Sequence, residues 1–523
     1  MKKLMTVLVI LGAAVLFFNP NAFSQTAKGT VFEDANKNLM LDKGEIGIPG
    51  VLVSNQRDVV QTDGNGRYTI RLDGDAVIFI TKPAGYQTPM NEVNLPQFYY
   101  IHQPKGSPKL EFGGVQPTGN LPKQVNFPLF KSQEPDTFSV LAFADPQTRD
   151  NDEISYLRDD VVAELIRSDA LCGITLGDIM YDDLSHYPRY NRVMAQLGIP
   201  LYNVPGNHDE NYDAASDEYS METFKRHFGP NYYSFDYGQV HFIVLDDVEY
   251  LGKNESGQPR YQGRIVEKQL TWLENDLRFV PSDKLIVLTK HIPIFSGQGT
   301  EPGINVTNRE ALFDILAGRK NILALAGHMH TLEHHFLGET LGWHGEKPIH
   351  EIICSAAAGA WWSGQKDERG IPVTDQSDGT PNGYHVIRFA ANQYTQYFKA
   401  ASRGADYQMR FASPLGIIAK SALDTTQIIV NIFDGSEKST ATCSIDDQPA
   451  QPMQRVIRID PFIHQSYQQQ KASMPYWLDA GYSTHIWSVA LPTDLAPGPH
   501  HIVVRTVDQY GVTHQAAHIF EVE

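Results

Sequence analysis

Short apolar runs separated by turns fill the first part of the chain, from about residue 26 to 130. These runs alternate with period two and cover residues 29–32, 51–54, 67–72 and 76–82. A turn such as Asp-Gly-Asn-Gly at 63–66 separates two of them, which is typical of β-strands in an antiparallel domain. We predict an all-β, Ig-like sandwich over residues 25–132. It ends in a Pro- and Gly-rich boundary segment at 116–136, with one last apolar patch at 125–130.

The pattern changes between residues 137 and 402, where apolar runs alternate with amphipathic stretches of helix length. We expect strands at 138–143, 171–176, 201–204, 239–245, 284–289, 322–326 and 349–355. Helices are expected at 153–167, 184–197, 265–279 and 308–316. Such alternation predicts an α/β domain in which the strands are covered on both faces.

Short alternating strands return between residues 403 and 523. The clearest are at 426–433, 484–491 and 500–507. They predict a second all-β, Ig-like domain, and no internal repeat accompanies it. Three domains agree with a length of 523 residues, since a domain has roughly 100–200 residues.

Composition adds two limits to this organisation. With 41% hydrophobic and 20% charged residues, the chain is expected to fold rather than to stay disordered. The formal net charge is −18, which disfavours a nucleic-acid partner unless positive charge is gathered in one place or supplied by metal ions. A phosphate group would therefore be attracted only at a place where positive charge is gathered on the protein.

The first 24 residues have the pattern of a secretory signal peptide. Lys2 and Lys3 precede an apolar run at 4–18, and the small residues Ala22 and Ser24 fit a cleavage site after Ser24. The alternative, a membrane anchor, is disfavoured because spanning a bilayer takes about 20 apolar residues. We expect an exported protein, periplasmic or extracellular, without a transmembrane segment in the mature chain.

Three cysteines, Cys172, Cys354 and Cys443, are too few for a disulfide scaffold in an exported chain of this length. They have no metal-ligand spacing. Cys172 and Cys354 lie in apolar, strand-like runs, and we expect them to be buried apolar side chains.

Polar residues that can bind metals follow five of the predicted central strands. In chain order the strands are followed by Asp145 and Gln147, by Asp178, by Asn207-His208-Asp209, by His291, and by His328 and His330. Open α/β sheets place their sites at the carboxyl ends of the strands. Two divalent ions about 3.5–4 Å apart need a bridging carboxylate with N and O ligands on each side, and Asp178 is the natural bridge. The adjacent Gly177, Gly206 and Gly327 would let the backbone turn sharply and approach the ions.

The ordered set Asp-x-Gln, Gly-Asp, Gly-Asn-His-Asp, His and Gly-His-x-His resembles the calcineurin-like metallophosphoesterase family. The resemblance covers residues 138–400 and implies an α/β/β/α sandwich. The family pattern implies one metal site formed by Asp145, Gln147, Asp178 and His330, and a second formed by Asp178, Asn207, His291 and His328. It also implies that His208 contacts the substrate phosphate or protonates the leaving group, and that Asp209 orients His208. With a β domain on either side, the layout resembles a bacterial exported subgroup.

The departure from the family pattern is Gln147, because the usual first block is Asp-x-His. An amide oxygen is a harder ligand than imidazole, so the first site is expected to favour Mn or Fe over Zn. The activity implied is hydrolysis of a small phosphate ester, either a monoester or a diester of a sugar, nucleotide or lipid. Attack by metal-activated hydroxide and a general acid, His208, would perform it.

Three aromatic residues on turn-rich loops, Trp361, Trp362 and Tyr384, are candidates for stacking on the organic part of a substrate. For the two tryptophans, packing against a neighbouring domain is an equal alternative. Asp182 and Asp183 follow the bridging carboxylate closely and are expected to form a solvated turn.

A loop in the first domain carries polar residues at the spacing of a calcium loop, namely Asp34, Asn36, Asn38, Asp42 and Glu45. Leu39 replaces the usual glycine, and the flanks predict strands, so this is not a standard EF-hand. Structural Ca²⁺ and a plain polar turn both remain open.

Two functions from different classes fit the sequence. The first is an exported phosphoesterase with two metal ions. The second is a non-catalytic carbohydrate- or surface-binding protein on the same scaffold. A scaffold needs neither a general acid such as His208 nor five ligand blocks in one domain.

Overall fold

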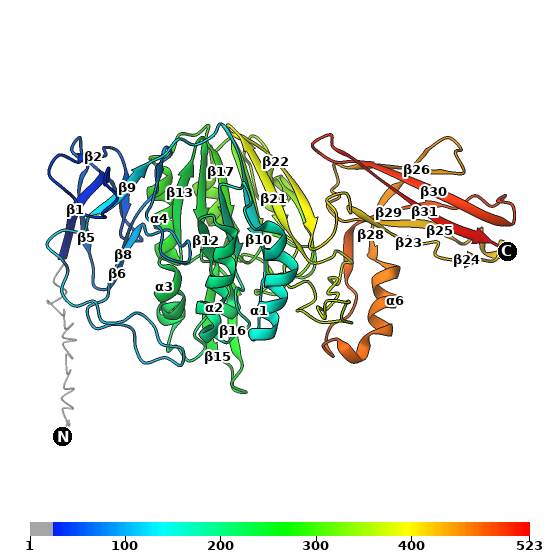
Figure 1. The fold of residues 1–523 in the computed structure, drawn as a ribbon, viewed down its shortest axis with the longest axis horizontal. Helices are drawn as coiled ribbons and strands as arrows, with labels where there is room; N and C mark the ends of the chain where they lie inside the picture. Colours follow the sequence, from blue (N-terminus) through cyan, green and yellow to red (C-terminus); the bar gives the residue numbers. More distant parts are fainter. Residues whose placement is uncertain (1–24) are drawn as a thin grey trace, which may run out of the picture.

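A computed structural model of the protein describes residues 25–523. The predicted signal peptide, residues 1–24, lies outside the described residues. Figure 1 shows three bodies in a row: a β-rich N-terminal domain, a central α/β domain and a C-terminal β domain. No helix in the described part of the chain has the length and apolar character needed to cross a bilayer.

The N-terminal domain consists of two sheets around a shared core. In one sheet β1 pairs with β2, β5 and β9, and β9 also pairs with β7; the other has the order β4-β3-β6-β8. Burial alternates along β5, where every second side chain enters the core. The strands are β1 (Gln25–Glu33), β2 (Ile46–Gly47), β3 (Leu52–Ser54), β4 (Val59–Gln61), β5 (Arg67–Leu72), β6 (Ala76–Ile80), β7 (Tyr86–Gln87), β8 (Tyr99–His102) and β9 (Phe127–Lys131). The last apolar patch of the sequence thus forms β9, while the Ig-like topology stays a prediction.

The central domain has two sheets packed face to face. The first has the order β12-β11-β10-β21-β22 and the second β13-β14-β17-β18-β20-β19, with the hairpin β15-β16 beside them. Their strands are β10 (Thr137–Phe143), β11 (Cys172–Leu176), β12 (Leu201–Val204), β21 (Gly383–Ala390), β22 (Gln393–Ala400), β13 (Tyr233–Tyr237), β14 (Val240–Val244), β15 (Val248–Lys253), β16 (Pro259–Gly263), β17 (Leu285–Thr289), β18 (Asn321–Ala326), β19 (Glu333–Leu337) and β20 (Ile349–Ile353). The strands β10, β11 and β12 are parallel, as are β14, β17, β18 and β20.

Alternate side chains of β10 explain the layering. Val140 and Ala142 enter the core between the sheets, whereas Leu141 and Phe143 face a second core formed with the helices of the outer layer. The outer helices of the first sheet are α1 (Asn151–Leu157), α2 (Tyr187–Met194) and α3 (Glu222–Phe228); those of the second are α4 (Glu267–Leu277) and α5 (Arg309–Leu316). The expected α/β/β/α sandwich is confirmed. The helix predicted over 153–167 is shorter, because α1 passes into a π turn at Arg158–Val162.

The C-terminal domain packs two sheets of order β23-β25-β29-β28 and β24-β31-β30-β26-β27 around its own core. Its elements are β23 (Met409–Ser413), β24 (Ile417–Ile418), β25 (Gln427–Ile432), β26 (Thr440–Ile445), β27 (Gln451–Pro452), β28 (Gln454–Ile459), α6 (Pro461–Gln469), β29 (Tyr482–Ala490), β30 (Gly498–Val507) and β31 (Thr513–Val522). Cys172, Cys354 and Cys443 are buried and free, as expected for Cys172 and Cys354.

Buried contacts join the flanking domains to the central one. At the N-terminal joint, Phe79 packs edge-on against Trp272 with ring centroids 6.0 Å apart. Lys82 Nζ donates to Glu134 (2.9 Å) and to the carbonyl of Asp236 (2.6 Å). The N-terminal core and the central core are therefore continuous.

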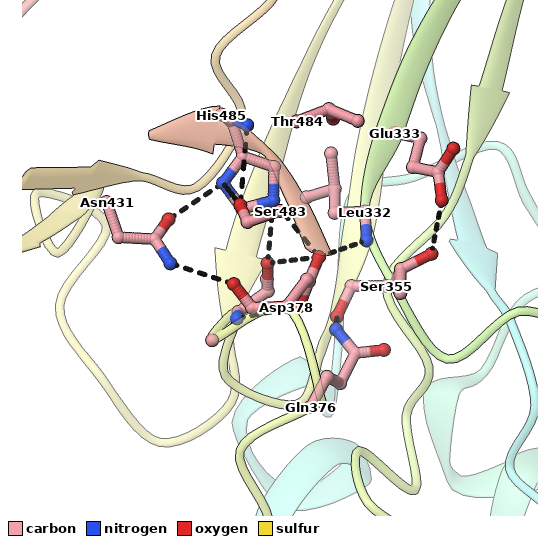
Figure 2. A network of polar contacts seen from close by, with 12 residues as sticks. Leu332, Glu333, Ser355, Gln376, Asp378, Asn431, Ser483, Thr484 and His485 are labelled. Atoms are coloured by element: carbon pink, nitrogen blue, oxygen red, sulfur yellow. Dashed lines mark hydrogen bonds and ion pairs between the residues drawn. The ribbon is translucent and has the colours of Figure 1, made fainter. Parts of the chain in front are cut away.

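At the C-terminal joint, Asp378 of the central domain lies in a buried network (Figure 2). Its carboxylate accepts from the backbone N–H of Leu332 (2.8 Å) and lies 3.0 Å from Nε2 of His485 in β29. Nδ1 of His485 is 2.7 Å from Asn431 Oδ1, and Asn431 also donates to Asp460 (2.8 Å). The chain just after β18 is thereby fixed to the C-terminal domain.

Candidate metal centre

All seven predicted metal ligands lie on loops at the carboxyl ends of parallel strands, where the two sheets meet. The loops after β10, β11 and β12 provide Asp145, Gln147, Asp178 and Asn207, and the loops after β17 and β18 provide His291, His328 and His330. All are buried except His328, which is partly buried. The strand-end pattern of the sequence thus corresponds to one place in the fold.

Four of these residues have donor atoms close together. Ligand atoms of Asp178, His291 and His328 all lie within 4.8 Å of one another. His291 Nε2 is 3.2 Å from Asp178 Oδ1 and 3.0 Å from Asn207 Oδ1. A carboxylate, an amide oxygen and two imidazoles form a donor set that fits a divalent transition-metal ion.

The other donor set surrounds Gln147. Its Nε2 donates to Asp178 Oδ2 (3.1 Å), while its buried Oε1 has no hydrogen-bond partner among residues 25–523. His330 Nε2 lies 3.8 Å from Asp145 Oδ1. Buried polar atoms are almost always paired, so the orphaned amide oxygen of a side chain that contacts Asp178 fits a role as a cation ligand.

Each histidine of the centre is oriented by a backbone carbonyl. His291 Nδ1 lies 2.9 Å from the carbonyl oxygen of Leu176, and His328 Nε2 lies 2.8 Å from that of Gly303. His330 Nδ1 is 2.6 Å from the carbonyl of Gly359. One ring nitrogen of each histidine is thus engaged, and the other faces the centre, which is the usual arrangement around metal-binding histidines.

The backbone at the centre is strained. Five predicted ligands have a positive φ, namely Asp145 (43°), Gln147 (37°), Asp178 (47°), His328 (73°) and His330 (50°). Left-handed conformations of residues other than glycine are costly and cluster at functional sites. Gly327 has a role expected from the sequence, because a Cβ there would lie 2.5 Å from Asp145 Oδ2.

Burial sets the protonation of three of the ligands, whereas at His291 burial is outweighed by the carboxylate of Asp178, which raises the pKa of His291 to about 10. It lowers the pKa of His328 to about 3 and that of His330 to about 4, so both rings are neutral at pH 7. A metal needs the neutral imidazole nitrogen as its ligand. Burial raises the pKa of Asp145 to about 8, because an ionised carboxylate is poorly solvated there.

The ring of His208 lies beside the centre and is held by Asp182. His208 Nδ1 is 2.5 Å from Asp182 Oδ1, and the ring stacks on Tyr181 with centroids 4.5 Å apart. Burial opposes the charged ring, but the carboxylates of Asp178 and Asp182 outweigh it and raise the pKa of His208. Asp182 is thus more than the solvated turn that the sequence suggested.

The sequence predicts that Asp209 orients His208, and the hydrogen bonds of Asp209 correct this prediction. Asp209 is fully buried, and its carboxylate accepts from the backbone N–H groups of Ile179 (3.1 Å) and Gly206 (2.9 Å). It therefore links the loop of Asp178 to the loop of His208 and does not face the imidazole. The only sequence feature that could point to Asp182 is its place four residues after Asp178.

Two of the three predicted substrate-binding aromatic residues are buried. Trp362 Nε1 donates to the carbonyl of Pro146 (2.9 Å), and Tyr384 packs in the core beneath the first sheet. The prediction of exposed rings is wrong for both residues, because Trp362 is anchored to the chain after β10 and Tyr384 lies in β21 rather than in a loop. Trp361 is half-buried, and its ring stacks on His330 with centroids 3.7 Å apart.

The predicted calcium residues lie in one loop after β1 and largely contact one another. Asp42 Oδ2 accepts from Nδ2 of Asn36 and of Asn38, both at 2.8 Å. Glu45 accepts from the backbone N–H of Asp42 (2.9 Å), and Asp34 accepts from that of Asn38 (3.3 Å). These contacts suit a plain polar turn as well as a calcium loop, so Ca²⁺ binding stays a prediction.

Three family models match the chain in order. The N-terminal part of calcineurin-like phosphoesterases matches residues 35–115, the calcineurin-like phosphoesterase domain matches 138–332, and the C-terminal part matches 351–514. The fold and the ligand blocks define a metallophosphoesterase. The chain belongs to the calcineurin-like phosphoesterase family, as the sequence predicted.

Curated relatives are similar over the central domain. A probable glycerophosphodiester phosphodiesterase of Arcobacter nitrofigilis is 27% identical over 184 residues, which are 34% of this chain and 63% of the relative. A 3′,5′-cyclic adenosine monophosphate phosphodiesterase of Pseudomonas aeruginosa is 26% identical over 159 residues, 30% of this chain and 53% of the relative. The matched region spans less than two thirds of these relatives. A solved dimetal phosphatase of Danio rerio has 16% identity and a TM-score of 0.36, covering 50% of this chain and 96% of its own.

Proposed function

We propose that the protein is a phosphoric ester hydrolase that uses two divalent metal ions. The convergence of carboxylate, amide and imidazole donors from five loops, with the orphaned Gln147 Oε1 among them, is the observation that carries this proposal. Asp145, Gln147, Asp178 and His330 would hold one ion, and Asp178, Asn207, His291 and His328 the other. Bound ions would supply a nucleophile from water at neutral pH and positive charge for a phosphoryl group.

Protein groups would perform the remaining steps. With Nδ1 of His208 engaged by Asp182, Nε2 is the ring nitrogen left for a substrate oxygen. We assign His208 as the group that protonates the leaving oxygen, a role that contributes about 10²- to 10⁴-fold in rate. The net charge of −18 supports a small anionic substrate that is attracted only locally. The amide ligand Gln147 supports Mn or Fe rather than Zn.

The test is a metal-dependent activity assay on the full chain. After removal of metals and loading with Mn²⁺, we expect hydrolysis of an aryl phosphate monoester or diester, and the preferred one separates a phosphatase from a phosphodiesterase. Asp178→Ala should abolish both metal binding and activity. Activity that survives chelation and this substitution would overturn the metal-dependent mechanism, whereas absence of hydrolysis by the Mn²⁺-loaded wild type would favour the non-catalytic binding scaffold.

A second variant isolates the general acid. His208→Ala should keep both metal ions, measured by elemental analysis, while turnover falls by about 10²- to 10⁴-fold. Loss of metal with unchanged activity per bound metal would instead make His208 a structural residue.

We also propose export to the periplasm or the extracellular medium. The basic residues Lys2 and Lys3, the apolar run and the small residues at 22 and 24 support it. Sequencing the N-terminus of the protein isolated from its host should give Gln25 as the first residue. An intact residue 1 in the cell interior would contradict export.

A further inference from the structure

Two histidines of the centre are each covered by an aromatic ring. His208 stacks on Tyr181 with an interplanar angle of 22°, and His330 stacks on Trp361 with an angle of 13°. Arg149 lies between these two stacks. Its guanidinium group lies 4.5 Å above the ring of Tyr181, and its Nη1 donates to the carbonyl of Trp361 (3.2 Å). One side of the metal centre is therefore bordered by two aromatic rings and a cation.

The C-terminal domain extends this border. Trp477, in the segment between α6 and β29, meets Trp361 edge-on with ring centroids 4.7 Å apart. Trp477 keeps 46% of its surface exposed, and the neighbouring Tyr476 keeps 90%. A contact that served packing alone would bury these rings, because large apolar side chains gain stability by leaving water.

The backbone that presents Trp361 is held in a costly conformation. Trp361 and Trp362 both have positive φ, at 55° and 50°. Two consecutive bulky residues in the left-handed region persist only where the surrounding structure imposes them, and such strain marks functional sites. The buried Trp362 anchors the turn, and Trp361 is thereby directed toward the metal centre.

Space for an organic group lies next to this border. A cavity of about 410 Å³ is lined by Arg149, Trp362, Ser473 and Pro475, and by Asp150, Asp152 and Glu153 around the start of α1; Trp361 and Trp477 are not part of its lining. Small-molecule sites are typically about 300–1,000 Å³. The cavity thus lies between the metal-binding domain and the segment that carries Trp477.

We propose that Trp477, with Trp361 and Arg149, forms a subsite for a planar aromatic ring of the phosphate ester, a nucleobase or an aryl group. This proposal rests on the proposed phosphoesterase function. An exposed indole offers a π-face on which a planar ring stacks. A glycerol group has no such face. Arg149 adds a cation that can lie over the same ring or hold a phosphate oxygen.

The experiment compares two inhibitors that differ only in the base. Adenosine 5′-monophosphate and ribose 5-phosphate are measured as competitive inhibitors of aryl phosphate hydrolysis by the Mn²⁺-loaded full chain, with inorganic phosphate as the reference. We expect the nucleotide to bind about tenfold or more tightly than the sugar phosphate, because each stacked base adds a gain of this order. Trp477→Ala should bring the two inhibition constants together and leave that of inorganic phosphate unchanged.

Matched variants keep the test decisive. Trp477→Phe retains a π-face and should preserve most of the preference, whereas Tyr397→Ala removes an exposed aromatic residue of β22 and should change nothing. Phenyl phosphate against ethyl phosphate distinguishes a general aryl site from a nucleobase site. Equal inhibition by both compounds in the wild type, or a preference that survives Trp477→Ala, overturns the subsite. Absence of any hydrolysis by the wild type would instead overturn the proposed function.

Discussion

Asp182 holds the imidazole of His208 from the solvent side, and about half of its own surface is exposed. Asp182→Asn would remove the charge that supports a protonated ring but keep a side chain of the same size. We expect turnover to fall about tenfold or more, because partners that orient such rings commonly contribute 10- to 100-fold. Steady-state kinetics and metal content measured on the same sample check this prediction.

Asp183→Asn is the matched control, since its side chain accepts from Ser185 rather than from His208. It should leave turnover unchanged. If Asp182→Asn and Asp183→Asn have the same small effect, the contact with His208 contributes nothing to catalysis.

For single residues, the sequence predicts which side chains lie together at the metal centre but not the direction in which each one points. Asp178, Asn207 and His291 follow apolar strands, and parallel strands bring their carboxyl ends together. The partner of His208 depends instead on the path of one loop. Asp182 and Asp209 are both carboxylates near the motif, and only the folded loop determines which one meets the imidazole.

The turn after β18, which carries two predicted ligands, is held by Asp378. Asp378→Ala would leave the N–H of Leu332 and the ring of His485 buried without their acceptor. We expect a loss of about 3 kcal/mol in the free energy of unfolding, because breaking a buried polar pair by removing one partner is costly. Binding of Mn²⁺ should weaken about tenfold, since this turn leads directly from His330.

Urea denaturation and metal titration measure these two effects. Glu255→Ala removes an exposed carboxylate in the turn between β15 and β16, and it should cost less than about 0.5 kcal/mol. A fully stable Asp378→Ala protein with unchanged metal affinity would show that the network in Figure 2 does not hold the turn.

His241 of β14 joins β13 and α4 through two carboxylates. Its Nδ1 is 2.7 Å from Asp236, which also binds Lys284 (2.8 Å), and its Nε2 is 2.8 Å from Asp276. Burial alone would lower its pKa, but Asp276 and Asp236 outweigh burial and raise the pKa of His241 to about 9. The ring is therefore protonated in the folded protein at pH 7.

A raised histidine pKa stabilises the folded state most at low pH. The contribution is complete below the unfolded pKa of about 6.5 and is lost as the pH rises through 9; it amounts to about 3 kcal/mol. The free energy of unfolding of the wild type should therefore fall between pH 6.5 and 9 by more than that of His241→Gln. Parallel pH profiles for the two proteins would contradict this.

Helices and strands could be predicted from the sequence where apolar residues alternate with polar ones or continue over several positions. The strands β10 and β17 are apolar runs of strand length, and both form where predicted. The end of the first central helix was not predictable, because residues 158–162 keep a helical pattern while the backbone widens into a π turn. The sequence does not predict the burial of Trp362, because the composition of a small-residue loop does not fix the direction in which the loop folds. It also does not predict that of Tyr384, which lies in β21 rather than in a loop.

Across the whole molecule, Lys82 is the buried charge that fastens the N-terminal domain. Its side chain is 2% exposed and that of Glu134 is 8% exposed. Lys82→Met would leave Glu134 as an uncompensated buried charge, which costs about 3–5 kcal/mol. We expect a lower thermal midpoint for the N-terminal and central domains together, because their core is continuous.

The double variant Lys82→Met, Glu134→Gln should recover most of that loss, because no unpaired charge remains. Lys28→Met, at an exposed position of β1, is the control. Calorimetry of the three variants measures the effect. Two separate transitions that shift independently would contradict a shared core.

The edge-to-face contact between Trp361 and Trp477 also bears on how this family diversifies. One ring belongs to the domain that carries the metal ligands and the other to a domain with its own core. Recombination that replaced only the C-terminal domain would thus alter the surface beside the centre without changing a single ligand. Conversely, a fragment that ended at residue 402 would keep every predicted metal ligand but would lose Trp477 from that surface. Inheritance of the two domains as a unit is the condition under which this surface stays intact.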